Sequence, residues 1–394
     1  FNGPTSACKD VALSILPHLM TASYEMNDME GEIIILTATS GDTGKAALEG
    51  FKNVGGTKVI VFYPEGGVSE VQKAQMATQD GKNTYVCAIR GNFDDAQTGV
   101  KNIFADEKIN REMAAKNKVL SSANSINIGR LVPQIVYYFY SYMKLIEKGD
   151  IKICDKVNFA VPTGNFGNIL AGYYAKILGL PINKLICASN ENNVLYDFIK
   201  TGVYDKNREF HKTISPSMDI LVSSNLERLL YYLCDKNNQT VNALMEKLNN
   251  TGKYEISSEM MEKLSNDFYG GCVFKEDAQK TIDSAFEKYG YLLDTHTAVA
   301  YKALEDYKTS TGDDSVSLVL STASPFKFSK SVYESLFGKA KDDEFELMEE
   351  LSEKTKVKVP ENLKNLKAKE VKHREVCSID EMGNYVTYVS NKLN

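Results

Sequence analysis

The chain has 394 residues, of which 43% are hydrophobic and 25% are charged, and its formal net charge is −6. This is the composition of a globular protein, and the length exceeds what one hydrophobic core usually organises, so we expect two domains. The negative charge argues against nucleic acid or an anionic membrane as a partner, although it is compatible with a local basic pocket. No apolar run reaches the roughly 20 residues that a membrane-spanning helix needs.

The cysteines and histidines are scattered along the chain. No two of the seven cysteines form a Cys-x-x-Cys pair, which predicts reduced thiols in a reducing compartment such as the cytoplasm. The four histidines show no zinc-binding spacing, so we expect no metal site. The chain starts without methionine, which is compatible with removal of an N-terminal segment.

In chain order, strands alternate with helices in the first part of the sequence. The predicted strands are 32–39, 57–64, 83–91 and 118–124. Helical patterns lie between them, at 40–53, 68–79 and 93–117. This alternation predicts a parallel sheet with helices on both faces.

The same alternation then repeats with different residues. The predicted strands of this second block are 156–164, 184–190 and 315–324, and the predicted helices are 165–179 and 327–337. A long, mostly helical insertion occupies about 224–308. From about 340 the chain is rich in charges of both signs, which predicts an exposed helix followed by a tail. We therefore expect an α/β protein with two doubly wound parallel-sheet domains. The expected division is 28–130 for a smaller domain, 1–27 plus 131–338 for a larger one, and 339–394 for a charged extension.

Four segments at strand ends carry the residues from which a site can be built, because ligands of open parallel sheets bind at the carboxyl ends of the strands. The segment TATSGDTGKAA (37–47) lacks the spacing of a Walker A loop, but places Ser40, Gly41, Thr43 and Gly44 at a helix start that favours an anion. The segment VPTGNFGNIL (161–170) has glycines that free backbone amides for an anion such as phosphate. The other two are STASPFKF (321–328), with small hydroxyl residues, and SSANSINIGR (121–130), with Arg130. Each segment also has a purely structural interpretation, as a capped helix, a tight turn or a surface ion pair.

A lysine, Lys9, follows the turn GPTSAC (3–8) at the start of an apolar helix. A lysine amine, a glycine-rich phosphate site and a small hydroxyl facing a ring nitrogen are the groups that pyridoxal phosphate (PLP) requires. The combination of these segments therefore indicates a PLP enzyme.

The chain resembles threonine synthase, a member of the tryptophan-synthase-like (fold type II) PLP enzymes. The motifs that carry the resemblance are collinear with those of the family. They are GPTSACKD, LTATSGDTGKAA, SANSINIGRL, VPTGNFGNILAGYYAK, SPSMDILVSSNLERLL, DTHTAVAYKAL and STASPFKF. Cys8 stands where the family usually has Phe, and Ser324 replaces His. The family has a segment before the lysine motif, so a truncated or trimmed form is expected from this sequence.

The resemblance implies roles for individual residues. Lys9 would be the Schiff-base lysine, and Thr322 would bind the pyridine nitrogen. The phosphate would be held by Gly164, Asn165, Phe166, Gly167 and Asn168. The role of Asp42 stays open, because an ionised carboxyl beside the ring hydroxyl is unfavourable, which leaves it protonated or turned away. The substrate candidates are Ser40, Thr43, Asn124, Ser125, Asn127 and Arg130, with Lys327 and His296 as weaker ones.

The implied reaction converts O-phospho-L-homoserine and water to L-threonine and phosphate. Burial and a nearby cationic imine are expected to lower the pKa of Lys9 so that its amine can move protons at neutral pH. The alternatives are a dehydratase or replacement enzyme of the same cofactor class acting on serine or threonine, and a PLP-binding chain without activity. The expected partner is the small-molecule substrate, with no nucleic acid and no membrane, and an oligomer is compatible with the sequence.

Overall fold

The computed structural model describes residues 1–392, which form two compact units. Unit 1 comprises residues 1–133, 326–330 and the described residues from 341 on. Unit 2 comprises residues 134–325 and 331–340. Each unit is built around its own parallel sheet.

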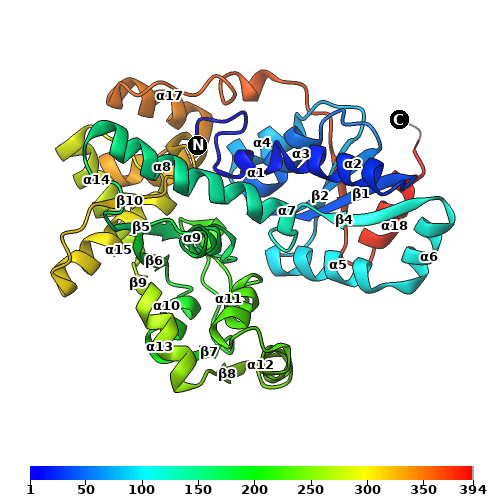
Figure 1. Cartoon of the computed structure of the whole chain (residues 1–394). Helices are drawn as coiled ribbons and strands as arrows, with labels where there is room; N and C mark the ends of the chain where they lie inside the picture. Colours follow the sequence, from blue (N-terminus) through cyan, green and yellow to red (C-terminus); the bar gives the residue numbers. More distant parts are fainter. Residues whose placement is uncertain (393–394) are drawn as a thin grey trace. The chain divides into compact units, whose positions relative to one another are not determined.

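Unit 1 has a five-stranded parallel sheet of order β11-β3-β2-β1-β4 (Figure 1). The strands are β1 (Glu32–Ala38), β2 (Thr57–Pro64), β3 (Thr84–Ile89), β4 (Lys118–Ser122) and β11 (Glu375–Cys377). The helices are α1 (Lys9–Leu13), α2 (Leu16–Met26), α3 (Asp42–Phe51), α4 (Glu70–Ala77), α5 (Phe93–Ala105), α6 (Glu107–Ala115), α7 (Ile128–Leu131), α17 (Glu344–Thr355) and α18 (Met382–Ser390). Short 3-10 turns lie at Pro325–Phe328 (η3) and Leu366–Ala368 (η4).

Alternate residues of β1 belong to two different hydrophobic cores. Ile33 and Ile35 pack with residues of α1, α2, α3 and α4, whereas Ile34 and Leu36 pack with residues of α5 and α18. Because successive strand residues point to opposite faces, the sheet is covered on both sides. Unit 1 is therefore doubly wound, as the sequence predicts.

The N-terminal segment lies in unit 1, whereas the expected division placed residues 1–27 with the larger domain. Leu13 and Leu16 join the core that contains Leu48 and Phe51 of α3. Gly50 allows this close packing, because a Cβ there would lie 2.0 Å from the carbonyl oxygen of Leu13. The apolar side chains of α1 are thus buried by α3 of the same unit.

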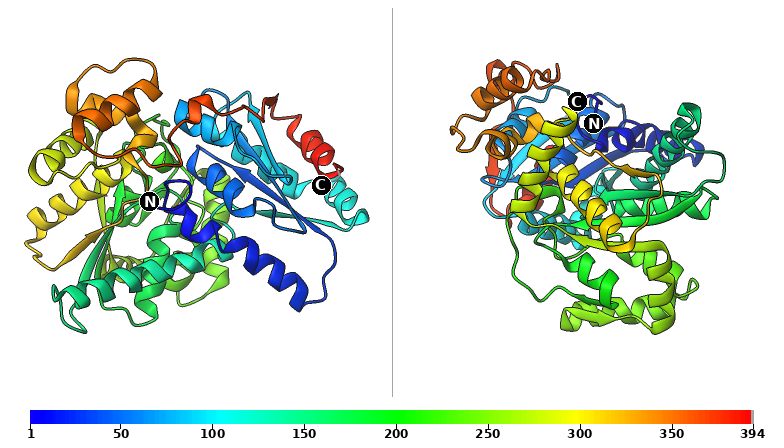
Figure 2. Two further views of the ribbon diagram at one scale, coloured as in Figure 1. Left: turned by 90° about the horizontal axis from the view of Figure 1, so that it is seen from above. Right: turned by 90° about the vertical axis from the view of Figure 1, so that its left-hand side faces the viewer.

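The end of the chain also differs from the expected charged extension with a tail. Strand β11 adds to the edge of β3, with Val376 paired to Ala88, and α18 buries Met382 and Val386 in the core of unit 1. Figure 2 shows α18, in red, beside the cyan helices α5 and α6, with which it is in contact. The charged residues between these apolar positions hid the short strand and the amphipathic helix.

Unit 2 has a four-stranded parallel sheet of order β10-β5-β6-β9 and a small antiparallel pair, β7-β8. The strands are β5 (Val157–Pro162), β6 (Ile182–Ser189), β7 (Val203–Asp205), β8 (Lys253–Glu255), β9 (Phe268–Cys272) and β10 (Ser317–Val319). The helices are α8 (Ile135–Lys148), α9 (Gly167–Ile177), α10 (Val194–Thr201), α11 (Leu226–Leu233), α12 (Asn238–Thr251), α13 (Ser258–Asp267), α14 (Lys275–Tyr289), α15 (Thr295–Thr311) and α16 (Ser329–Phe337). A short 3-10 turn lies at Pro216–Met218 (η2), and another, Val132–Gln134 (η1), begins in unit 1 and ends at the first residue of unit 2.

Strand β9 lies inside the segment that was expected to be a helical insertion. Its sequence, FYGGC, contains two glycines, which are unfavourable in strands and conceal the pattern. A Cβ on Gly270 would lie 3.2 Å from the Tyr196 carbonyl oxygen, and one on Gly271 would lie 2.7 Å from the Ala303 Cβ. The glycines therefore let α10 and α15 approach opposite faces of the strand.

Within residues 1–392, no helix combines the length and the apolarity that crossing a membrane requires.

Candidate active site

Lys9 is the first residue of α1 in unit 1, and its side chain is 16% exposed. The turn that precedes it is fixed by Asp10, whose carboxylate accepts hydrogen bonds from the backbone N–H (2.9 Å) and the hydroxyl of Thr5. Ser6 has a positive φ of 58°, which reverses the chain just before the helix. The start of the chain is thus a defined turn that presents one amine.

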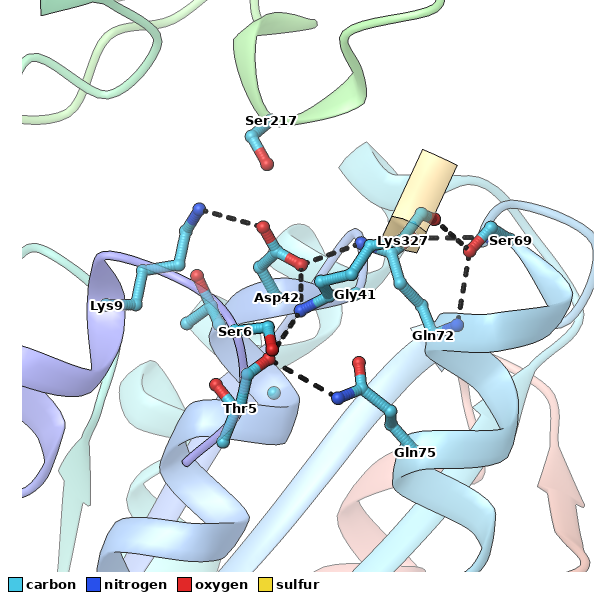
Figure 3. A network of polar contacts seen from close by, with 12 residues as sticks. Thr5, Ser6, Lys9, Gly41, Asp42, Ser69, Gln72, Gln75, Ser217 and Lys327 are labelled. Carbon is cyan, nitrogen blue, oxygen red and sulfur yellow. Dashed lines mark hydrogen bonds and ion pairs between the residues drawn. The ribbon is translucent and has the colours of Figure 1, made fainter. Parts of the chain in front are cut away.

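Asp42 begins α3 and lies between two lysines, as Figure 3 shows. Its Oδ2 is 3.4 Å from the Lys9 Nζ, and its Oδ1 is 2.6 Å from the Lys327 Nζ. Oδ1 also accepts a hydrogen bond of 2.9 Å from the Gln72 side-chain amide. Gly41 allows Gln72 to approach Asp42, because a Cβ at Gly41 would lie 2.4 Å from the Gln72 side chain. The φ of 130° at Gly41 is also a backbone conformation that favours glycine. One buried carboxylate therefore faces two ammonium groups.

The charges of this cluster set the protonation states. Burial alone would raise the pKa of Asp42, but the nearby charges of Lys327 and Lys9 outweigh it and lower the pKa well below its usual range. In this environment, without the cofactor, Asp42 therefore favours the ionised form. Burial would likewise lower the pKa of Lys9, but the charge of Asp42 outweighs it and raises the pKa. The expected lowering of this pKa applies to Lys9 beside a cationic imine, whereas here a carboxylate faces the amine.

Arg130, expected to bind the substrate phosphate, is 8% exposed in unit 1. Its guanidinium donates to the Ala123 carbonyl oxygen (2.8 Å) and to the Thr43 hydroxyl (3.3 Å). The structure thus brings two of the substrate candidates, Arg130 and Thr43, into direct contact.

Asn124 and Asn127 are engaged by the backbone of unit 1. The Asn124 side-chain amide exchanges two hydrogen bonds with the backbone of Ala38, at 3.1 and 2.8 Å. The Asn127 side chain donates to the Ser122 carbonyl oxygen and accepts from Gly129 at the start of α7. These asparagines hold the loop after β4 against the end of β1. Ser40 and Ser125, by contrast, are half-buried at the same two strand ends.

In unit 2, the turn 164–168 joins β5 to α9. The hydroxyl of Ser223 donates to the Gly164 carbonyl oxygen (2.8 Å), and the Asn225 side chain donates to that of Asn165 (2.7 Å). Phe166 caps α9 in the left-handed conformation, with a φ of 63°. The carbonyls of the turn are thus bound, and its backbone N–H groups open the first turn of a helix, where no carbonyl of the helix can accept them.

The side chains of this turn are fixed by aromatic residues. Phe166 is buried against Phe268, with ring centroids 5.8 Å apart. The Asn168 carboxamide oxygen accepts hydrogen bonds from the hydroxyls of Tyr137 and Tyr138. These contacts hold the side chains of Phe166 and Asn168 in place.

Thr322 lies after β10, at the same sheet edge as the turn 164–168, because β10 and β5 are parallel neighbours. Its backbone N–H donates to the Thr297 hydroxyl (3.3 Å). His296, a weaker substrate candidate, is 2% exposed and has its Nδ1 3.0 Å from the Asp294 carboxylate. The His296 Nε2 accepts a hydrogen bond from the Ser217 N–H (3.1 Å). His296 thus supports the neighbouring loop.

Asp219 was not among the predicted site residues, although it lies in the SPSMDILVSSNLERLL motif. Its carboxylate accepts hydrogen bonds from the side chains of Asn190 (2.8 Å), Asn192 (3.0 Å) and Thr213 (2.7 Å). The 3-10 turn η2 that precedes Asp219 contains Ser217, whose carbonyl oxygen would lie 2.5 Å from a Cβ at Gly164. Asp219 therefore fixes the segment that packs against the turn 164–168.

Comparisons with known proteins agree with this geometry. A family model described as "Pyridoxal-phosphate dependent enzyme" matches residues 1–322, and one described as "Threonine synthase, C-terminal" matches residues 297–380. Threonine synthase of Saccharomyces cerevisiae is 40% identical over 358 residues, covering 86% of this chain and 68% of the relative. The chain belongs to the threonine synthase family.

A crystal structure of PLP-bound threonine synthase from Brucella melitensis matches with a TM-score of 0.84 and 34% identity, covering 100% of this chain and 78% of that one. A protein named "Threonine synthase-like 1" from Pongo abelii is 41% identical over 344 residues, covering 85% of this chain and 45% of its own. The chain thus spans about half the length of that relative. The predictions of family, fold class and PLP as cofactor are confirmed.

The residues of this threonine synthase family member fit PLP. Within unit 1, Lys9 presents an amine of the kind that bonds to the PLP aldehyde. Within unit 2, the backbone N–H groups of the turn 164–168 suit a phosphate. Gly164 allows the segment around Ser217 to pack on this turn, since a Cβ there would lie 2.5 Å from the Ser217 carbonyl oxygen. Thr322 adds a hydroxyl at the same edge of the unit 2 sheet. Among residues 1–392, no group of three or more His, Cys, Asp and Glu side chains is arranged to hold a metal ion.

Lys327 and Gln72 make contacts with Asp42 that the motifs did not indicate. Lys327, a weaker candidate for the substrate, is 0% exposed and paired with Asp42, which is a different environment from one that receives a substrate phosphate. Gln72 lies on α4 in a segment that was read only as a helix. The only signal in the sequence was that both polar residues have apolar residues near them. Such a position predicts that the polar side chain is buried and hydrogen-bonded to a partner.

Proposed function

We propose that the chain catalyses the PLP-dependent conversion of O-phospho-L-homoserine and water to L-threonine and phosphate. The observation that carries this proposal is the match to a PLP-bound threonine synthase, at 34% identity over 100% of the chain. The position of Lys9 at the start of α1, beside the Asp42 carboxylate, supports it. The proposed product, threonine, places the enzyme in amino-acid biosynthesis, as a lyase.

PLP supplies an aldehyde that bonds to amines and a ring that withdraws electrons from the Cα of an amino acid. Lys9 would hold the cofactor through its amine, Thr322 would contact the ring nitrogen, and the turn 164–168 would bind the phosphate. The Lys9 Nζ would take the proton from the substrate Cα. A second proton leaves Cβ, phosphate leaves Cγ, and a proton returns to Cγ. Water then adds its hydroxyl to Cβ, and a proton returns to Cα to complete threonine.

Proton transfer by Lys9 depends on Asp42. In the structure the carboxylate holds the amine in its charged form, because it raises the pKa of Lys9. The amine must lose this proton before it can act as a nucleophile or base. A buried carboxylate beside the amine keeps it oriented during this exchange.

The substrate phosphate carries about two negative charges, which need cationic and N–H groups when they leave water. Arg130 is the best placed of the predicted residues, because its guanidinium already contacts Thr43 at the start of α3. Ser40, Thr43 and Ser125 are the proposed hydroxyl donors. Asn124 and Asn127 would support these loops, since their side chains are bonded to the backbone of unit 1. His296 would instead support the segment around Ser217 in unit 2.

All seven cysteines are free thiols in the structure, including Cys87 and Cys377, whose sulfur atoms are 3.4 Å apart. Two thiols so close would be prone to oxidation in an oxidising compartment. This supports the proposed location in the cytoplasm.

The test supplies the full chain with PLP and O-phospho-L-homoserine and measures phosphate and threonine. We expect equal amounts of the two products, and a loss of about 10²–10⁴-fold or more for Lys9→Ala, because general acid–base catalysis alone contributes that much. Borohydride should fix the cofactor on the peptide that contains Lys9. The matched control is Lys52→Ala, a partly exposed lysine of unit 1, which should keep both activity and trapping.

Other outcomes would point to the alternatives. Ammonia and a 2-oxo acid from serine or threonine, without phosphate release from O-phospho-L-homoserine, would identify a dehydratase. Cofactor trapping on Lys9 with no turnover of any substrate would identify a PLP-binding chain without activity.

A further inference from the structure

Lys327 is a buried lysine that the proposed reaction does not use directly. It lies in the 3-10 turn η3, in the part that belongs to unit 1, and it is 0% exposed. Its ammonium group is 2.6 Å from the Asp42 Oδ1 and 3.1 Å from the Thr5 carbonyl oxygen. Burial of an ammonium group destabilises the folded chain unless the group is paired, so the partners of Lys327 must compensate for its burial.

The two oxygens of Asp42 have different partners. Oδ1 has the short contacts, with Lys327 and the Gln72 amide (Figure 3). Oδ2 is 3.4 Å from the Lys9 Nζ, a longer and weaker contact. Gln72 is itself held, because its side-chain oxygen accepts from the Ser69 N–H at the start of α4. One side of the carboxylate is thus fixed, and the other faces the reactive amine.

Lys327 also contacts the turn that precedes Lys9. The Thr5 carbonyl oxygen accepts hydrogen bonds from Lys327 and from the Gln75 side chain (3.3 Å), and the Thr5 N–H and hydroxyl bind Asp10. The same ammonium group therefore connects the backbone before Lys9 to the carboxylate that faces Lys9.

We propose that Lys327 is the permanent counter-ion of Asp42 and, through it, a positioning residue for the Lys9 amine. This rests on the proposed function, since it takes Lys9 to be the group that reacts. When Lys9 loses its charge, either by giving up a proton or by bonding to a carbonyl carbon, Asp42 keeps Lys327 and Gln72. The carboxylate therefore stays ionised, and the reaction at Lys9 does not force a proton onto it.

Other titratable groups also act on this cluster. Cys8 and Arg130 interact electrostatically with Lys9, and Lys45 interacts with Lys327. The charge of Arg130 acts on Lys9 in the direction that lowers its pKa, while Asp42 raises it. Among these groups, Lys327 is the one in direct contact with Asp42 besides Lys9.

The first experiment removes the charge of Lys9 in the full chain, free of PLP. Three variants are compared: Lys9→Met, Lys9→Met with Lys327→Met, and the same pair with Asp42→Asn. Infrared spectra at neutral pH report a protonated buried carboxyl. We expect no such band in Lys9→Met, a new band in the double variant, and its loss in the triple variant. A band already present in Lys9→Met, or none in a folded double variant, would overturn the proposal.

A second measurement keeps Lys9 and serves if the double variant does not fold. An acetylating reagent labels the Lys9 amine of the PLP-free chain as a function of pH, and the labelled peptide is quantified. Without Lys327, Lys9 is the remaining cation of Asp42, so the labelling midpoint of Lys327→Met should rise by about one pH unit. Lys327→Arg should restore it towards the original value.

A lysine with only a structural role would leave this midpoint unchanged, or would lower it by loosening the packing, and either result contradicts the proposal. Neither measurement involves the substrate. If the chain releases no phosphate from O-phospho-L-homoserine, the proposed function fails, but the infrared and labelling results still decide the role of Lys327.

Discussion

Two buried aspartates, Asp42 in unit 1 and Asp219 in unit 2, have opposite electrostatic environments. They are 1% and 5% exposed, and both accept several hydrogen bonds. The partners of Asp42 include two ammonium groups, whereas those of Asp219 are amides, a hydroxyl and a backbone N–H. The pKa of Asp42 is lowered, and that of Asp219 is raised, because burial outweighs its hydrogen bonds from Thr213 and Asn190.

The comparison shows that neutral hydrogen-bond donors and charged groups have different effects on a buried carboxyl group. Neutral donors fix the position of a carboxyl group but do not replace the hydration of its charge. Asp219 accordingly orders a loop, the segment around Ser217 that packs on the turn 164–168. Asp42 retains its charge, which is what a group facing a reactive amine requires.

The largest effect is expected for Asp42→Asn. The variant leaves the fully buried Lys327 without its counter-ion, so the free energy of unfolding of the PLP-free chain should fall by about 3–5 kcal/mol near neutral pH. Because the folded pKa of Asp42 is lowered, its stabilising effect is present above the unfolded pKa of about 3.9 and is lost as the pH falls towards the folded value. Urea unfolding of both chains at several pH values measures this.

The difference in the free energy of unfolding between wild type and Asp42→Asn should therefore become smaller as the pH falls. A difference that stays constant across the acidic range would mean that the carboxylate charge is not what stabilises unit 1. A loss below 1 kcal/mol at neutral pH would mean that Lys327 finds another partner, at variance with its short contact to Asp42.

The sequence predicted most of the sheets because their strands are continuous apolar runs. The expected strands 32–39 and 57–64 correspond to β1 (Glu32–Ala38) and β2 (Thr57–Pro64). Strand β9 was missed because its glycines serve the packing of α10 and α15, which no local pattern reveals. Strand β11 was missed because three residues at a sheet edge gain their structure from β3, far away in the sequence.

The candidate site was predictable where one segment makes it. The turn 164–168 and the position of Lys9 follow from short motifs that fold locally. The role of Lys327 does not, because its partners, Asp42 and Thr5, lie far from it in the sequence. A lysine whose environment is set by tertiary contacts has the same sequence signature as one exposed to solvent. For the same reason the sequence did not indicate that a carboxylate would raise the pKa of Lys9 in the absence of the cofactor.

A smaller effect is expected for Asp219→Asn. The new amide cannot accept all of the hydrogen bonds from Thr213, Asn190 and Asn192, which should cost about 1–3 kcal/mol. The folded pKa of Asp219 is raised, so the folded state holds the proton more tightly, and the contribution of Asp219 declines as the pH rises from about 3.9 through the folded pKa. The free energy of unfolding of wild type should thus exceed that of Asp219→Asn by the largest amount at acidic pH.

This pH dependence is opposite to that of Asp42→Asn, and the two series can be measured under identical conditions. If the stability differences from wild type become smaller at acidic pH for both variants, then Asp42 and Asp219 do not differ in their electrostatic environments as described. The affinity for PLP provides a second measurement. It should be weaker in Asp219→Asn if the segment around Ser217 moves away from Gly164.

The smallest effect is expected for Asp80→Asn, which calibrates the other two. The Asp80 carboxylate is 2.8 Å from the Lys52 ammonium, closer than Asp42 is to Lys9, but the two side chains are 56% and 29% exposed. Water and ions screen such a pair, so its loss should cost about 0.2–1 kcal/mol and even less in high salt. If distance alone governed these pairs, Asp80→Asn would rival Asp42→Asn in urea unfolding. A difference of several-fold instead assigns the stabilisation to burial and to the two cations that Asp42 faces.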